Sequence, residues 1–284
     1  MTYAYPEVLV TTDWVAQHGG DDRVRLIEVD VDTTAYDQGH IPGAVAWNWQ
    51  SQLNDPVRRD IPDPAAFARL LGEAGVEPGT TVVLYGDHNN WFAAFGFWLL
   101  QLYGHEAAKL MDGGRAKWAA EHRPLVTERP SVARTDYPVP KGPRSALRAR
   151  RPEVERALSA GGKVLVDVRS PAEFTGDIIA PPGLPETAQR GGHIPGARNV
   201  PWSQAVAPDG TFKPRAELER LYQAAGVIDG QDREVIAYCR IGERSSHTWF
   251  ALKYLLGVKK VRNYDGSWTE WGNLVGAPIA KGAE

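Results

Sequence analysis

The hexapeptide Gly-His-Ile-Pro-Gly-Ala occurs twice in the 284-residue chain, at residues 39–44 and again at residues 192–197. The copies are 153 residues apart (192 − 39), and the same offset relates several later landmarks. These are the apolar runs 82–86 and 235–239, the runs 98–104 and 251–257, the Asp-Gly pairs 112–113 and 265–266, and Trp118 with Trp271. A register held through so many landmarks predicts two homologous domains.

The second copy carries an insertion near its start. Residues 26–29 align with residues 165–168 at an offset of only 139 (165 − 26), which leaves 14 extra residues (153 − 139) before the second hexapeptide. The Gly/Pro-rich stretch 177–192 holds them.

The two copies are separated by a proline-rich segment without periodicity, residues 127–143. Such composition is typical of an extended, semi-rigid linker. We therefore predict a domain at residues 1–127, a linker at residues 128–146 and a second domain at residues 147–284.

Each half alternates short apolar runs with amphipathic segments. In the second half we expect strands at residues 164–168, 234–238 and 260–264, and helices at residues 215–225 and 245–256. Ser245 or Ser246 would cap the latter helix. Strands alternating with helices predict the α/β class, with a parallel sheet flanked by helices in each domain.

Charge and composition exclude several classes of protein. With 32 Lys+Arg against 35 Asp+Glu, the net charge of −3 argues against a nucleic-acid partner and against a polybasic membrane-surface protein. The longest apolar stretch, residues 91–100, is too short to span a membrane, which takes about 20 residues. The N-terminal ten residues lack the pattern of a signal peptide. We therefore expect a cytoplasmic protein, either a monomer or a weak homodimer.

The single cysteine, Cys239, allows neither an intramolecular disulfide nor a Cys-based zinc cluster. It ends a predicted strand and precedes a predicted helix, the place where parallel α/β sheets bind ligands. Backbone N–H groups, the helix dipole and two arginines would lower the cysteine pKa from about 8.5 to about 3.5–7.5. We predict Cys239 as an ionised nucleophile, Arg240 and Arg244 as ligands of an anionic substrate, and a loop that stabilises a persulfide, formed by Ile241, Gly242, Glu243 and Ser245.

The first copy provides an internal comparison, because Gly86 stands where the second copy has Cys239. Glycine cannot act as a nucleophile, so we expect the first domain to be catalytically inactive. His40 and His193 occupy the same place in the two hexapeptides, which favours a shared structural role. The seven histidines show no His-x₃-His spacing, and we expect neither a metal nor another cofactor.

Over nearly its whole length the chain resembles the tandem-domain rhodaneses, the thiosulfate sulfurtransferases. Residues 36–44 are similar to the N-terminal signature of that family, residues 264–272 to its C-terminal signature, and residues 239–244 to the bacterial loop that begins Cys-Arg-Ile-Gly-Glu-Arg. The resemblance implies two rhodanese-like domains, with a persulfide on Cys239. Vertebrate members have a substrate-binding arginine four residues after the arginine of an Asp-x-Arg motif; here that motif ends at Arg169, and Glu173 replaces the later arginine. Arg169 is kept as a candidate substrate contact.

The resemblance further implies that Cys239 takes the outer sulfur of thiosulfate, releases sulfite and passes the sulfur to cyanide, a thiol or a thioredoxin-like protein. A 3-mercaptopyruvate sulfurtransferase would use the same persulfide with a carboxylate donor, and a non-enzymatic sulfur carrier or regulatory module is a further alternative. A cysteine phosphatase or arsenate reductase is disfavoured, because those enzymes place five residues between Cys and Arg, whereas four separate Cys239 from Arg244.

Overall fold

The computed structural model describes residues 2–183 and 187–283, which form two compact units. The N-terminal unit holds residues 5–144 and 208–212. The C-terminal unit holds residues 2–4, 145–207 and 213–283 as far as they are described. Residues 184–186 of the predicted insertion lie outside the described part of the chain.

The segment that follows the first domain's last helix packs against the N-terminal unit. The Thr135 amide donates to Gly72 O at 3.0 Å, and the Thr135 hydroxyl donates to Val76 O at 2.6 Å. The domain boundaries near residues 127 and 147 stay a prediction.

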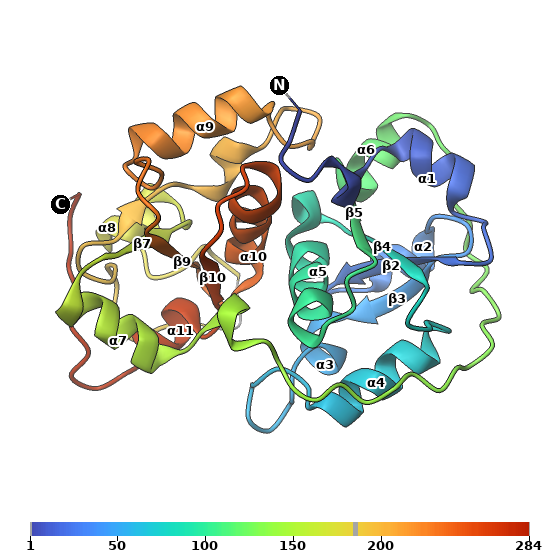
Figure 1. The fold of residues 1–284 in the computed structure, drawn as a ribbon, viewed down its shortest axis with the longest axis horizontal. Helices are drawn as coiled ribbons and strands as arrows, with labels where there is room; N and C mark the ends of the chain where they lie inside the picture. Colours follow the sequence, from blue (N-terminus) through green and yellow to red (C-terminus); the bar gives the residue numbers. More distant parts are fainter. Residues whose placement is uncertain (1, 184–186, 284) are drawn as a thin grey trace. The chain divides into compact units, whose positions relative to one another are not determined.

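The N-terminal unit is built on a five-stranded parallel sheet of order β1-β5-β4-β2-β3 (Figure 1). Its strands are β1 (Leu9–Val10), β2 (Val24–Asp30), β3 (Val45–Asn48), β4 (Thr81–Tyr85) and β5 (Ala108–Met111). Its helices are α1 (Thr12–His18), α2 (Thr34–Gln38), α3 (Trp49–Gln52), α4 (Pro64–Glu73), α5 (Trp91–Tyr103) and α6 (Gly114–Ala120), with 3₁₀ turns η1 (Pro6–Val8) and η2 (His88–Asn90).

The C-terminal unit repeats this topology, with a parallel sheet of order β6-β10-β9-β7-β8. Its strands are β6 (Arg148–Ala149), β7 (Lys163–Asp167), β8 (Arg198–Asn199), β9 (Glu234–Tyr238) and β10 (Val261–Tyr264). Its helices are α7 (Arg151–Ala160), α8 (Pro171–Thr175), α9 (Arg215–Ala224), α10 (Glu243–Phe250) and α11 (Ser267–Trp271), with 3₁₀ turns η3 (Ser145–Leu147) and η4 (Trp202–Ala205) and a π-turn η5 (Ala251–Leu255). The matching strand orders confirm the α/β class and the internal duplication.

The predicted strands of the second half are found close to their expected bounds, because they are buried in a parallel sheet that is covered on both faces. The helix predicted at residues 215–225 is found as α9, which buries Leu218 and Tyr222. The start of α10 differs from the prediction. This helix begins at Glu243, and its N-cap is Gly242, with φ of +102°. Ser245 and Ser246 do not cap the helix; the Ser246 hydroxyl donates to Gly242 O at 2.7 Å within the first turn.

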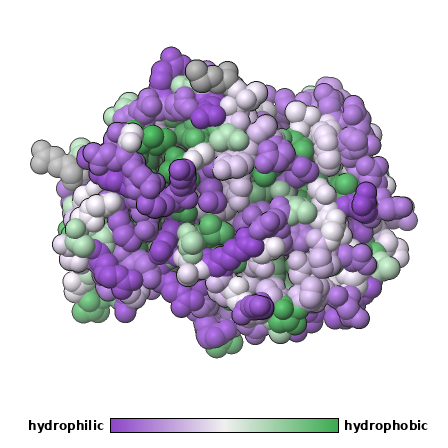
Figure 2. Space-filling model, in the orientation of Figure 1, coloured by the Kyte–Doolittle hydropathy of each residue, from purple (hydrophilic) through white to green (hydrophobic). Residues whose placement is uncertain are grey.

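No helix in residues 2–183 or 187–283 is long and apolar enough to cross a membrane. The most apolar one, α5, has 13 residues. Figure 2 shows a face covered mostly by hydrophilic side chains, with smaller apolar groups between them. Large exposed apolar side chains such as Val57 and Val275 lie in loops.

Candidate active site

Cys239 immediately follows β9, and three residues separate it from the start of α10. Its backbone is fixed by the N-terminus of α11, since the Cys239 amide donates to Ser267 Oγ at 3.1 Å and the Trp268 amide donates to Cys239 O at 3.1 Å. Gly242 closes the turn in a left-handed conformation, and a Cβ there would lie 2.9 Å from Asp265 Cα. The sharp turn therefore requires glycine.

The Cys239 sulfur is buried, but its surroundings are polar. The Gly242 amide donates to Sγ at 3.1 Å, and Sγ lies 3.1 Å from Glu243 Oε2. Burial and then the negative charge of Glu243 raise the cysteine pKa, while Arg244 and Ser245 act to lower it. The net shift is upward, so the expectation of a lowered pKa is wrong. The main cause is the burial of the sulfur, and the negative charge of Glu243, 3.1 Å from Sγ, adds to it.

Arg244 is held by Glu173 in a buried, two-pronged ion pair. Its Nη1 and Nη2 donate to the two carboxylate oxygens of Glu173 at 3.0 and 3.1 Å, and its Nε lies 3.5 Å from Glu243 Oε1. Burial opposes ionisation of Glu173, but the bonds and charge of Arg244 outweigh it, and the Glu173 pKa falls below its ordinary value. Glu173, which stands where vertebrate rhodaneses have an arginine, thus binds Arg244.

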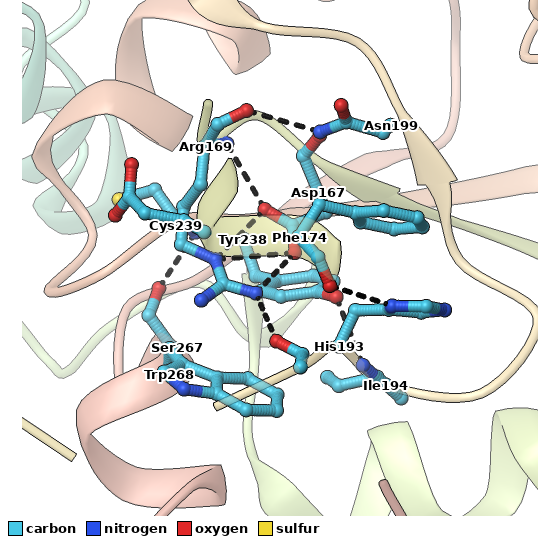
Figure 3. Close-up of polar contacts among 12 residues, drawn as sticks. Asp167, Arg169, Phe174, His193, Ile194, Asn199, Tyr238, Cys239, Ser267 and Trp268 are labelled. Carbon is cyan, nitrogen blue, oxygen red and sulfur yellow. Dashed lines mark hydrogen bonds and ion pairs between the residues drawn. The ribbon is translucent and has the colours of Figure 1, made fainter. Parts of the chain in front are cut away.

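Arg169 is held by buried contacts with residues from several elements (Figure 3). Its guanidinium pairs with Asp167 (Nη2–Oδ2, 2.6 Å), donates to Gly192 O at 2.7 Å and stacks over the Trp268 ring at 4.4 Å. These contacts join the end of β7, the second hexapeptide and α11. Its side chain is fully buried. A contact of Arg169 with substrate stays a prediction.

The remaining predicted loop residues lie together around Cys239. The Ile241 amide donates to Glu243 Oε2 at 3.3 Å. Two loop amides thus have different acceptors: Ile241 binds the Glu243 carboxylate, and Gly242 binds the Cys239 sulfur. The Ser245 hydroxyl bonds to Asn263 Oδ1 at 2.6 Å in the interior of the unit. Arg240 follows Cys239 directly and is 7% exposed.

Sequence reasoning missed Ser267. Its Oγ accepts the Cys239 amide and donates to Tyr264 O at 2.6 Å, and its φ of +51° is unusual for a residue other than glycine. The only signal was its place in the C-terminal signature segment, which gave no hint of a contact with Cys239.

The two hexapeptides have the same structural role. The His193 Nδ1–H donates to Phe174 O at 2.8 Å, and its ring stacks on Phe174 with centroids 3.6 Å apart. His40 repeats both contacts with Tyr36, at 2.9 and 3.7 Å. The prediction of a shared structural role is confirmed.

The first copy lacks both the cysteine and the space for one. A Cβ on Gly86 would clash with Val29 O and would lie 3.1 Å from Asp30 Oδ1. The Asn90 side chain accepts from the Gly86 amide at 3.0 Å. Burial raises the pKa of Asp30 to about 8.

Both copies have a buried ion pair near this strand end, but in the first copy the arginine comes from a different position in the repeat. By the repeat register, Glu28 and Asp30 replace Asp167 and Arg169 (offset 139), and the Glu28 carboxylate pairs with Arg115 at 3.1 Å. Arg115 itself stands where the second copy has Trp268 (offset 153).

Among the residues described, no group of three or more His, Cys, Asp or Glu side chains is arranged to hold a metal ion. His247 is buried, its ring meets Trp202 edge to face at 5.8 Å, and burial lowers its pKa to about 3. His247 is therefore a packed, neutral residue.

The sequence of both units matches a known protein family. Residues 11–121 and 151–274 match the rhodanese-like domain. The chain belongs to the rhodanese-like family. It is 54% identical to "Sulfur carrier protein TtuD" of Thermus thermophilus over 288 residues, covering all of both chains. It is 56% identical to a protein of Haloferax volcanii named "Putative thiosulfate sulfurtransferase" over 281 residues, covering 97% of each chain.

A solved structure shares the fold of the whole rhodanese-like chain. The anaerobic ergothioneine biosynthesis enzyme from Chlorobium limicola, in complex with trimethyl histidine, superposes with a TM-score of 0.84 at 24% identity. The match covers 99% of this chain and 71% of that enzyme. At this identity the likeness concerns the fold.

Proposed function

We propose that the protein is a thiosulfate sulfurtransferase that carries sulfane sulfur on Cys239. Membership of the rhodanese-like family and the names of relatives more than 50% identical support a role in sulfur transfer. The observation that carries the proposal is the position of Cys239 Sγ at the carboxyl end of β9, 3.1 Å from the Gly242 N–H. A persulfide anion formed there meets a backbone donor in place of water.

The reaction has two displacement steps. Cys239 Sγ attacks the outer sulfur of thiosulfate, the S–S bond of the donor breaks, and sulfite leaves with the electron pair. Cyanide or a thiol then attacks the outer sulfur of the Cys239 persulfide and releases the cysteine. A covalent intermediate of this kind predicts ping-pong kinetics.

The arginines have different roles in this scheme. Both terminal nitrogens of Arg244 already bind Glu173, so we assign Arg244 to positioning of the loop. Arg240, next to the nucleophile, is the proposed ligand of the sulfonate group. Arg169 supports the loop through Asp167 and through Trp268, whose amide donates to Cys239 O.

A sulfur carrier is the second candidate, because a relative 54% identical over its whole length bears that name. A carrier would hold the same Cys239 persulfide but would receive the sulfur from another protein. The two functions therefore differ in whether thiosulfate alone loads Cys239.

Intact-mass measurement after exposure to thiosulfate, and separately to 3-mercaptopyruvate, tests the proposal. The wild type should gain one sulfur atom from thiosulfate and lose it on addition of cyanide, whereas Cys239→Ala should gain none. Preferential loading by mercaptopyruvate would assign the protein to that branch. Turnover of thiosulfate by Cys239→Ala, or failure of thiosulfate to load the wild type, would overturn the proposal.

A further inference from the structure

The Cys239 proton needs an acceptor before the sulfur can attack. Only the thiolate is an effective nucleophile, yet Cys239 is fully buried, and burial and Glu243 favour the thiol. A protein group that already contacts Sγ is placed to take this proton as the sulfur attacks.

Glu243 is such a group. Its Oε2 lies 3.1 Å from Sγ, within the range in which a general base accepts a proton. The Gly242 amide, at the same distance, is a donor and stabilises the thiolate without accepting its proton. Among the hydrogen bonds that the described residues make to Sγ, the one to Glu243 is the only one with a carboxylate acceptor.

The Glu243 carboxylate is held in place from two sides. The Ile241 amide donates to Oε2 at 3.3 Å, and Arg244 Nε lies 3.5 Å from Oε1. Arg244 in turn is anchored by both oxygens of Glu173, whose own carboxylate accepts from the Ser170 amide at 3.1 Å. A nucleophile, a base that contacts it and a third group that orients the base is the arrangement of an activated nucleophile.

We infer that Glu243 is the general base that takes the thiol proton of Cys239 as the sulfur attacks its donor. This inference rests on the proposed function. In the first step the S–H bond breaks and its proton moves to Glu243 Oε2, while a new S–S bond forms between Sγ and the sulfane sulfur. The donor's S–S bond breaks, and sulfite departs with that electron pair. One carboxylate and the dianion thiosulfate become one carboxylic acid, one persulfide anion and the dianion sulfite, so charge and electrons balance.

Protonation of Glu243 also favours the product. An ionised Glu243 beside a persulfide anion would place two negative charges in a buried loop, whereas a protonated one leaves a single charge. The new carboxylic acid can donate a hydrogen bond to the persulfide. The same group could return its proton when the acceptor releases the Cys239 thiolate.

Several charged groups surround Cys239 and Glu243. The charged groups around the loop are Arg240 within it, Arg244 of α10 with Glu173 of α8, Asp167 of β7 with Arg169, and Asp265 after β10 with Arg148 of β6. Of these charges and that of Glu243, the carboxylate of Glu243 raises the Cys239 pKa and the guanidinium of Arg244 lowers it.

The rate of sulfur loading as a function of pH tests the inference. Wild type, Glu243→Gln and the matched control Glu217→Gln, on the exposed face of α9, are mixed with thiosulfate, and kcat/KM and persulfide formation are followed from pH 6 to pH 10. Wild type and control should show flat profiles through neutral pH. Glu243→Gln should load about 10²–10⁴-fold more slowly at pH 6, because its thiol has lost the base. The difference should narrow toward pH 10, where the thiol ionises unaided.

Whether Glu243→Gln loads sulfur more slowly or faster than wild type at pH 6 decides between a general base and a charge that hinders ionisation. If Glu243 only hindered ionisation by its charge, Glu243→Gln would load faster than wild type at pH 6, and the inference would fail. If Glu243→Gln is inactive at every pH, Glu243→Asp serves as the deciding variant: a flat profile at reduced rate supports the inference, and a profile shifted to alkaline pH overturns it. Failure of the wild type to load at any pH would instead refute the proposed function.

Discussion

Replacement of Glu173 by glutamine should destabilise the C-terminal unit by removing one charge from a buried ion pair. The side chains of Glu173 and Arg244 are 1% and 6% exposed, so the guanidinium would lie buried with only the Glu243 carboxylate, 3.5 Å from its Nε, as counter-charge. Breaking a buried pair in this way costs about 3–5 kcal/mol. Glutamine still serves the capping box that Glu173 forms with Ser170 at the start of α8, and its carbonyl oxygen still accepts one bond from Arg244. We therefore expect the lower end, about 3 kcal/mol.

Native-state hydrogen exchange measures this loss within one unit of a two-unit chain. The amides of β9 that exchange only when the unit unfolds should exchange about 150-fold faster in Glu173→Gln than in wild type. A matched control is Glu155→Gln, which removes an exposed ion pair with Arg151 (54% and 42% exposed) in the same unit. Such pairs contribute about 0–1 kcal/mol, so the control should accelerate exchange by less than about fivefold. Equal acceleration in the two variants would show that the Glu173–Arg244 pair does not hold the loop.

Three further substitutions probe the loop, the inactive copy and the interior. Gly242→Ala should cost about 1–3 kcal/mol and slow sulfur loading, because alanine is strained at φ of +102°; an unchanged melting temperature would contradict this. Gly86→Cys, made in a Cys239→Ala background, should take up no sulfur from thiosulfate and should melt at a lower temperature, because the new Cβ has no space; a gain of one sulfur by mass would disprove it. His247 has a folded pKa of about 3 against about 6.5 unfolded, so the stability it contributes is complete above about pH 6.5 and declines as the pH falls toward 3. From pH 7 to pH 5 the wild type should lose about 2 kcal/mol more than His247→Asn in thermal unfolding, and parallel pH profiles would refute the assignment.

The duplicated α/β architecture could be read from the sequence, because the hexapeptides and the apolar runs keep one register through both halves. Buried parallel strands such as β9 need continuous apolar residues, and this requirement leaves a clear trace. The position of Cys239 at a strand end followed for the same reason. The start of α10 was missed because Ser245 and Ser246 resemble N-caps, whereas Gly242 caps the helix through its backbone conformation.

The electrostatics of the loop could not be read from the sequence. The two arginines near Cys239 suggested a positive site, but the charge at the sulfur depends on which carboxylates face it. Glu173 is 71 residues away in sequence from Arg244, and only the fold brings the two together. Glu243 was counted as part of a stabilising loop, although its side chain turns back onto the cysteine.

The buried ion pair is formed by residues at different repeat positions in the two copies, so its members must be exchanged together. At the first site the guanidinium comes from Arg115 and pairs with Glu28 next to the buried Asp30, whereas at the second it comes from Arg169 and pairs with Asp167. Asp30→Arg alone would set two guanidinium groups against each other, and Arg169→Asp alone would leave two carboxylates together. Copying a short tract from one half of the gene onto the other would thus bring like charges together in the interior of the hybrid, at a cost that exchanging both members of a pair avoids.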